Sequence, residues 1–372
     1  MRSAAIQRAV RVAWSTRGLL VVTGLLVALA GCDEQTPVLV TASPSRSSST
    51  PASPQPTLNS NLKPMLHGLI DRDGPPAAAL RNVVTNFVVA VNWSDLQPTP
   101  GDIVANNAID QAMTTARRMN AVAGQTPVGI KIRLYTGVYA PAWAKQLGGP
   151  PVAVTAGALT GTVGRFWTDA FGAAYADLWK RLAARYDSVP EIREVTVSRC
   201  MTFYAETMIR DVEDPSTVQN LLSAGFTINA DKSCISQEIQ LGTVWHSTRI
   251  GVAFNPYQLV VGAGVHASDE DFTEQMMHYC RVTLGPQCVL ENNSIRFPLQ
   301  PGLYQHMYEA MILLGSPISF QTAALTRIGD LTTTLQWAAS VGANAVELPK
   351  GYNAVPAATL ASVVAALPVS KG

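Results

Sequence analysis

The sequence predicts an α/β fold, a single (β/α)8 TIM barrel over residues 61–372. From residue 64 on, short apolar runs alternate with longer stretches of helical spacing, an order typical of a parallel sheet. This region of about 310 residues has the length of one such barrel. The alternative, an open doubly wound sheet, usually has a glycine-rich turn after its first strand. Residues 71–76 (DRDGPP) do not provide that turn.

Eight runs rich in apolar or β-branched residues are the predicted strands. They cover residues 65–70, 86–91, 128–134, 194–198, 249–254, 288–290, 317–320 and 344–348. Predicted helices between and after them cover residues 108–119, 171–182, 271–282, 304–314 and 356–366. The second helix has an aromatic stripe that includes Phe171, Tyr175 and Trp179, with the spacing of a face that packs on the core.

The first 31 residues have the features of a targeting segment. Four arginines and no acidic residue precede an apolar run at 19–30 that is too short for a comfortable membrane span. The run ends in Leu29-Ala30-Gly31-Cys32, which resembles the lipobox of bacterial lipoproteins. The resemblance implies cleavage before Cys32, a lipid on its thiol, and export to the outer face of the bacterial cell membrane. The alternative is an ordinary secretory signal in which Cys32 falls by chance.

Residues 32–60 are dominated by Ser, Thr, Pro and Gln and contain few large apolar side chains. Such a stretch cannot bury enough surface to offset its chain entropy. We therefore expect a disordered tether that holds the barrel away from the membrane surface.

The composition indicates a large core and a mildly polar surface, with 47% hydrophobic and 14% charged residues and a net charge of +1. A nucleic-acid-binding protein would need a basic stripe, which the sequence lacks. P-loop, H-E-x-x-H and G-x-S-x-G motifs are also absent, so we expect no cofactor. We expect a monomer.

Four cysteines remain once Cys32 is set aside, an even number that favours disulfides in an exported chain. Three pairings are possible. We favour Cys280–Cys288, which closes a short loop and leaves Cys200–Cys234 as the second pair. A zinc site is the rival, but the spacing of these cysteines does not fit a zinc ligand cluster. We therefore predict no metal.

The chemistry of an α/β barrel lies at the carboxyl ends of its strands. There the sequence places carboxylates, amides and flat aromatic rings, with few basic groups. Sugars need this mixture, because their C–H faces stack on rings and their hydroxyls pair with polar side chains. A phosphate-binding site would require more Arg and Lys side chains at these strand ends. The candidate sugar-binding residues are Trp93, Asp95, Arg133, Tyr135, Trp143, Tyr204, Asn292 and Gln321.

Two motifs resemble those of retaining (β/α)8 glycoside hydrolases, including the β-galactosidase and xylosidase types. Residues 93–101 (WSDLQPTPG) are similar to the Trp-x-x-Leu-x-Pro-x-x-Gly of their second βα unit. Residues 140–143 (APAW) are similar to their Pro-x-Trp loop. The resemblance implies hydrolysis of O-glycosidic bonds in an oligo- or polysaccharide, with Glu206 as the acid/base after the fourth strand.

The chain departs from that family at two positions. Ala205 replaces the usual Asn before the acid/base, and Gln321 occupies the place of the nucleophile Glu at the end of strand seven. Most glycosidases need two carboxylates. We rank Glu347 first as the second carboxylate, Glu291 second and Asp95 third.

Several alternatives stay open. Glu347 could instead be a structural carboxylate paired with Arg133 or Lys350, and Glu291 could lie in a surface turn. The missing strand-seven carboxylate is consistent with a catalytically inactive barrel that binds carbohydrate. A solute-binding lipoprotein is a third hypothesis, which the lipid anchor fits and the single eightfold alternation does not.

Overall fold

The computed structural model describes residues 61–209 and 214–368. The predicted signal peptide, Cys32 and the whole predicted tether lie outside the described residues. No helix within the described ranges combines the length and apolar character needed to cross a bilayer.

The described residues form a closed barrel of eight parallel strands, as predicted. In order around the barrel each strand pairs with the next as β1-β12-β11-β10-β7-β6-β3-β2, and β2 closes onto β1. The strands are β1 (Gly68–Asp71), β2 (Val84–Asn92), β3 (Gly129–Tyr135), β6 (Ile192–Thr196), β7 (Arg249–Ala253), β10 (Cys288–Ile295), β11 (Ile318–Thr322) and β12 (Ala345–Leu348). Each overlaps its predicted run, and β10 extends furthest beyond it.

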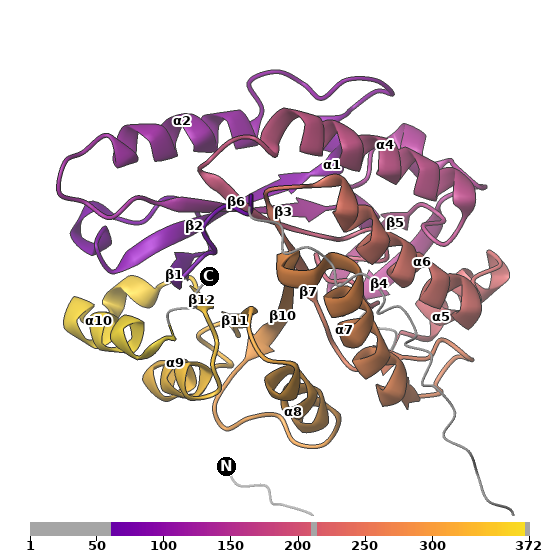
Figure 1. Cartoon of the computed structure of the whole chain (residues 1–372). Helices are drawn as coiled ribbons and strands as arrows, with labels where there is room; N and C mark the ends of the chain where they lie inside the picture. Colours follow the sequence, from indigo (N-terminus) through magenta and orange to yellow (C-terminus); the bar gives the residue numbers. More distant parts are fainter. Residues whose placement is uncertain (1–60, 210–213, 369–372) are drawn as a thin grey trace, which may run out of the picture. The chain divides into compact units, whose positions relative to one another are not determined.

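The longer helices form an outer ring around the strands, which Figure 1 shows. They are α2 (Ala108–Asn120), α4 (Asp169–Tyr186), α6 (Ile228–Leu241), α7 (Glu270–Leu284), α8 (Leu303–Leu314), α9 (Leu331–Ser340) and α10 (Ala357–Ala366). Three shorter helices lie in the connections. They are α1 (Trp93–Leu96) after β2, α3 (Ala142–Lys145) after β3, and α5 (Pro215–Ser223) between β6 and α6. Helices α5, α6 and α9 were not among the predicted helices.

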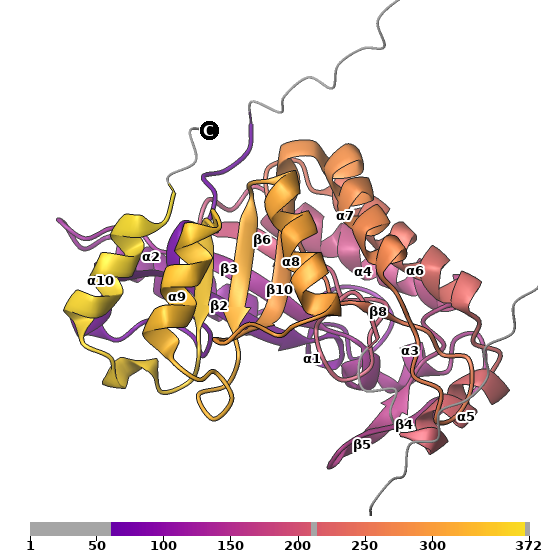
Figure 2. The same cartoon turned by 90° about the horizontal axis from the view of Figure 1, so that it is seen from below.

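Two small antiparallel pairs add to the barrel and were not predicted. The hairpin of β4 (Val152–Ala156) and β5 (Leu159–Val163) is inserted between β3 and α4. It lies beside α5 in Figure 2, where the Thr217 hydroxyl accepts a hydrogen bond from the Thr155 amide at 2.7 Å. The second pair is β8 (Tyr257–Gln258) with β9 (Ser268–Asp269). Two-residue strands carry too little periodicity for a sequence pattern to reveal.

The aromatic stripe of α4 packs on the barrel, as the sequence predicts. Trp179 is fully buried, stacks on Tyr175 with ring centroids 5.7 Å apart, and meets Trp245 edge-on at 5.8 Å. Its indole N–H donates to the Leu241 carbonyl at 3.0 Å. The stripe therefore joins α4 to the segment that leads into β7.

Both favoured disulfides are present. Cys200–Cys234 joins the loop after β6 to α6, and Cys280–Cys288 joins the end of α7 to the start of β10. The first spans 34 residues and the second 8.

We expect the longer bridge to stabilise the protein more than the shorter one. A disulfide limits the unfolded chain in proportion to the logarithm of its loop length, so replacing Cys200 and Cys234 with alanine should cost about 1 kcal/mol more than replacing Cys280 and Cys288. Urea denaturation of the two double variants under identical conditions measures this difference. Equal losses would contradict the loop-length account.

Candidate active site at the carboxyl end of the barrel

Strand β3 points a series of polar side chains into the barrel. Lys131, Arg133 and Tyr135 are spaced by two residues, so they share one face of the strand. Lys131 is 1% exposed and Arg133 is 3% exposed. Buried cations need anionic partners, because an unpaired charge away from water is costly.

Lys131 finds three such partners on three other strands. Its Nζ lies 3.0 Å from Glu194 Oε1, 2.7 Å from Glu291 Oε2 and 2.9 Å from Glu347 Oε1. Arg133 Nη2 donates to the same Oε1 of Glu347 at 2.5 Å. These five buried residues are called the interior ion cluster below.

The interior ion cluster settles where two predicted catalytic candidates lie. Glu347 pairs with Arg133, as one open interpretation held, and also with Lys131. Glu291 is buried in the middle of β10 and not in a surface turn, so the turn interpretation was wrong. The sequence pattern did not single out Lys131 or Glu194. The signal that could have found Lys131 is a pair of charges, Lys131 and Arg133, two residues apart within the otherwise apolar run GIKIRLY.

The pKa values of the cluster separate its members. Burial raises the pKa of Glu291 to about 8, against the opposing charge of Lys131. Burial would also raise the pKa of Glu347, but Arg133 and Lys131 outweigh it and hold that pKa at about 2. Burial would lower the pKa of Lys131, and the surrounding carboxylates raise it instead. The two cations therefore keep Glu347 ionised at neutral pH, whereas burial shifts Glu291 towards its protonated form.

The cluster fits because β7 contributes a glycine beside it. A Cβ atom at Gly251 would lie 1.9 Å from Glu291 Oε1 and 2.7 Å from its carboxyl carbon. No side chain larger than hydrogen leaves room for Glu291 in this position.

Glu206 lies in the loop that follows β6, and its side chain is 6% exposed. Asn255, just past β7, donates its Nδ2–H to Glu206 Oε2 at 2.6 Å. The Asn255 amide oxygen in turn accepts from Tyr304 at 3.3 Å and from Asn292 at 3.4 Å. Tyr308 donates to Asn292 Oδ1 at 3.0 Å. A polar network therefore reaches from Glu206 through β7 and β10 to α8.

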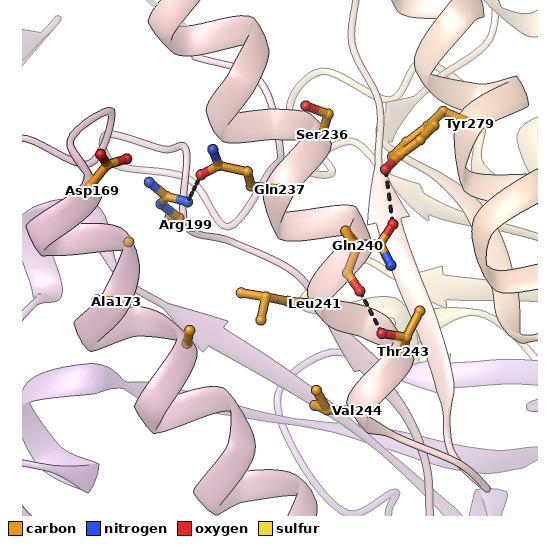
Figure 3. A pocket seen from close by; sticks show the side chains of 12 residues that line it. Asp169, Ala173, Arg199, Ser236, Gln237, Gln240, Leu241, Thr243, Val244 and Tyr279 are labelled. Carbon is orange, nitrogen blue, oxygen red and sulfur yellow. Dashed lines mark hydrogen bonds between the residues drawn. The ribbon is translucent and has the colours of Figure 1, made fainter.

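The loop that carries Glu206 is attached to α6. Glu238 on α6 accepts hydrogen bonds from the Arg199 amide at 2.6 Å, from the Cys200 amide at 3.4 Å and from the Thr207 hydroxyl. The Arg199 guanidinium also donates to Gln237 at 2.7 Å, as Figure 3 shows. With the Cys200–Cys234 bridge, these contacts anchor the loop on both sides of Glu206.

Arg199 and Gln237 also line a groove of about 520 Å³ between α4 and α6. Its lining includes Tyr279 from α7 and none of the residues predicted to bind or cleave a substrate. The groove lies on the helical layer, so it is distinct from the carboxyl end of the barrel.

Glu206 and Glu347 belong to opposite walls of the barrel. Strands β6 and β12 are separated by three strands in either direction around it. The charges of both carboxylates affect the pKa of Tyr135, at the end of β3. Burial raises the pKa of its phenol, Arg133 opposes that rise, and the charges of Glu347 and Glu206 both add to it. Both acids therefore lie within electrostatic range of the Tyr135 phenol.

The prediction that Trp93 offers a ring to a sugar needs correction. Trp93 is fully buried, and it contacts Trp143, Phe171 and Tyr175 edge-on at centroid distances of 5.7, 5.4 and 6.2 Å. Its indole N–H donates to the Gln97 side chain at 2.9 Å. The burial leaves no face of the ring open to a ligand.

The two motifs that resemble glycoside hydrolases lie against each other. Trp143 is half-buried against Trp93 and donates its indole N–H to the Gln97 carbonyl at 3.1 Å. Gln97 donates in turn to the Gly101 carbonyl at 2.5 Å. This contact fixes the loops after β2 and β3 at the same end of the barrel.

The other predicted sugar-binding residues lie at or just beyond strand ends. Asp95 is exposed on α1 and accepts from Asn92 at 2.9 Å. Tyr204 is 42% exposed. Gln321 in β11 is half-buried and donates to the Asn293 carbonyl at 3.3 Å. Asn292 is fully buried within the polar network behind Glu206.

Within residues 61–209 and 214–368, no group of His, Cys, Asp and Glu side chains is arranged to hold a metal ion.

Comparisons with known proteins concern the fold alone. No protein-family model and no curated protein matches the chain. The catalytic domain of a β-amylase from Paenibacillus polymyxa is 10% identical, with a TM-score of 0.48 over 78% of this chain and 94% of that chain. An endoglucanase from Pseudomonas stutzeri is 9% identical, with a TM-score of 0.43 over 80% and 94%. A D-psicose 3-epimerase from Clostridium cellulolyticum is 9% identical, with a TM-score of 0.41 over 80% and 96%.

Substitution of Gly251 tests the packing of the interior ion cluster. Gly251→Ala places a methyl group on the Glu291 carboxyl group, so we expect a loss of about 2–4 kcal/mol in the free energy of unfolding. Gly262→Ala is the control, because the nearest atom to its Cβ would be at 3.6 Å. Urea denaturation measures both variants. Equal stability of the two alanine variants would show that Glu291 moves aside without cost.

The raised pKa of Glu291 makes stability depend on pH. The folded protein holds this proton between the ordinary pKa of 4.5 and about 8, whereas the unfolded chain releases it. The free energy of unfolding should therefore fall as the pH rises from 5 to 8. Glu291→Gln should reduce that slope by on the order of 1 kcal/mol per pH unit.

Denaturation at several pH values tests this linkage. Glu274→Gln, at an exposed position on α7, is the control and should leave the slope unchanged. A wild-type slope retained in Glu291→Gln would assign the pH dependence to other groups. Glu238, whose pKa burial also raises to about 8, is the first of these.

Proposed function

We propose that this protein is an exported glycoside hydrolase, held at the outer face of the cell membrane by a lipid on Cys32. Its substrate is an oligo- or polysaccharide. Glu206 acts as the general acid/base, and Glu347 is the ionised carboxylate on the other side of the scissile bond. The observation that carries the proposal is the position of these two acids on opposite walls, near one phenol, that of Tyr135.

The environment of Glu347 suits an anion in this role. Its Oε1 forms ion pairs with Lys131 and Arg133, and no hydrogen bond from the described residues reaches its Oε2. Since its pKa is about 2, Glu347 stays ionised and cannot serve as the proton donor. It can stabilise the positive charge that develops on the sugar ring, or attack the anomeric carbon through Oε2.

Glu206 suits the complementary role. It lies in the loop after β6, in a mostly buried position, and Asn255 donates a hydrogen bond to one of its carboxyl oxygens. Protonation of the departing glycosidic oxygen requires an acid with a fixed orientation, and the loop contacts with α6 supply that rigidity. Glu291 is a weaker candidate, because it lies deeper in its strand and is bound to Lys131.

A second candidate function is a carbohydrate-binding barrel without catalytic activity. Two observations favour it. Gln321 stands at the end of β11, where an amide cannot act as a nucleophile, and Glu347 is only 1% exposed behind its two cations. The sequence motifs and the exposed Tyr204 are equally compatible with this function. A solute-binding lipoprotein is less well supported, because the described residues form one closed barrel and not two lobes.

The substitution Glu206→Gln tests the proposed acid. Removal of the proton donor should lower hydrolysis at least about 100-fold, whereas oligosaccharide binding persists. A panel of α- and β-linked oligosaccharides is assayed for release of reducing sugar, and binding is followed by calorimetry.

Glu309→Gln, at an exposed position on α8, is the matched control and should hydrolyse at the wild-type rate. Wild-type turnover in Glu206→Gln would remove Glu206 from the mechanism. Binding by the wild-type protein without release from any bound oligosaccharide would establish the second candidate function instead.

A further inference from the structure

Arg72 is a cation at the mouth of the barrel that the sequence reasoning did not select. It follows directly after β1 and reaches across the end of β12 to Thr322, the last residue of β11. Its Nη2 donates to the Thr322 carbonyl and, at 3.2 Å, to the Thr322 hydroxyl. Both partners are neutral, so neither offsets the charge of the half-buried guanidinium.

Arg72 forms no ion pair with any residue in the described part of the chain, and its Nη1 and Nε make no hydrogen bond there. Among the described residues Arg281 also leaves its Nε without a hydrogen bond, but its terminal nitrogens are used differently from those of Arg72. Arg281 is also half-buried, but it uses both terminal nitrogens on the carbonyls of Cys288, Gly315 and Pro317. Both terminal nitrogens of Arg281 therefore donate hydrogen bonds, whereas within the described residues only Nη2 of Arg72 does.

The charges around Arg72 leave room for an anion. Burial lowers the pKa of Arg72; the charge of Glu347 opposes that effect without contact, and the charge of Arg133 adds to it. Glu347 is already bound to Arg133 and Lys131. Asp71 and Asp73 flank Arg72 in sequence. However, Asp71 accepts from Tyr352 at 2.6 Å and from the Asp73 amide at 2.9 Å, and Asp73 is exposed to water.

From this arrangement we propose that Arg72, with Arg133 behind it, forms a subsite for an anionic substituent on the sugar that binds beside Glu347. An arginine presents a planar fork of donors that suits a carboxylate, and the same donors suit a sulfate or phosphate ester. The substrate class is therefore an acidic saccharide. This inference rests on the proposed function only in that the ligand is a carbohydrate, and it holds for a hydrolase and for a binding barrel alike.

The test compares each acidic saccharide with its neutral counterpart. Calorimetry on the full-length protein measures binding of galacturonate, glucuronate and mannuronate oligosaccharides beside their carboxyl-reduced forms. Sulfated galactan oligosaccharides are measured beside their desulfated forms, so that the two kinds of anion are distinguished. We expect at least one acidic saccharide to bind tenfold or more tightly than its neutral form, with a preference that weakens as salt is added.

Substitutions then assign the preference to Arg72. Arg72→Gln should reduce it below threefold and leave the affinity for the neutral form unchanged. Arg72→Lys keeps the charge without the planar fork and should give an intermediate preference. Arg281→Gln is the control at the amino end of the barrel and should retain the wild-type preference.

The outcomes separate this inference from the proposed function. Equal binding of all acidic and neutral forms, or a full preference in Arg72→Gln, would overturn the anionic subsite. If the wild-type protein nevertheless released sugar from a neutral oligosaccharide, the hydrolase proposal would stand without the subsite. An acidic preference without any hydrolysis would support the subsite and reject the hydrolase.

Discussion

The interior of this barrel is organised around one buried amine. The interior of a (β/α)8 barrel is usually filled with layers of branched apolar side chains. Here Lys131 replaces part of that filling and contacts carboxylates from β6, β10 and β12. Removing four or five ionic groups from water is costly, so the arrangement persists only because each group has an oppositely charged neighbour at hydrogen-bonding distance. The cluster thereby joins β6, β10 and β12 to β3.

The candidate site depends on this amine through Glu347. Arg133 alone would fix one oxygen of that carboxylate, and Lys131 holds the same oxygen from the side of the barrel interior. The opposite acid, Glu206, is positioned by unrelated means, since its partners are Asn255 and the loop contacts with α6. The two acids therefore owe their positions to two separate parts of the fold.

The fold could be predicted from the sequence because its signals are local. Alternating apolar runs and helical stripes gave eight strands in the observed order, and the short spacing of Cys280 and Cys288 indicated their bond. The hairpin of β4 and β5 escaped because its Ala, Val, Thr and Gly residues carry little periodic contrast.

The candidate site was less predictable, because its geometry depends on contacts between distant strands. Glu347 and Glu206 could be placed at strand ends, but nothing in the sequence states that Lys131 meets Glu194, Glu291 and Glu347. Trp93 was misjudged for the same reason. A tryptophan after a strand can face a ligand or the core, and the deciding neighbours, Phe171 and Tyr175, are about 80 residues away in sequence. The contact of Arg72 was not predictable, because its partner, Thr322, is 250 residues away in sequence.

The attachment of the Glu206 loop to α6 has a consequence for protein engineering. Because the Cys200–Cys234 bridge, Glu238 and Gln237 all join that loop to α6, the two segments form one exchangeable cassette. A graft of the loop alone onto another barrel would leave the Glu238 contacts behind and release the acid from its orientation. A graft of the whole stretch from β6 through α6 would keep these loop contacts, but Asn255, which lies after β7, would have to accompany it for the acid to keep its hydrogen bond.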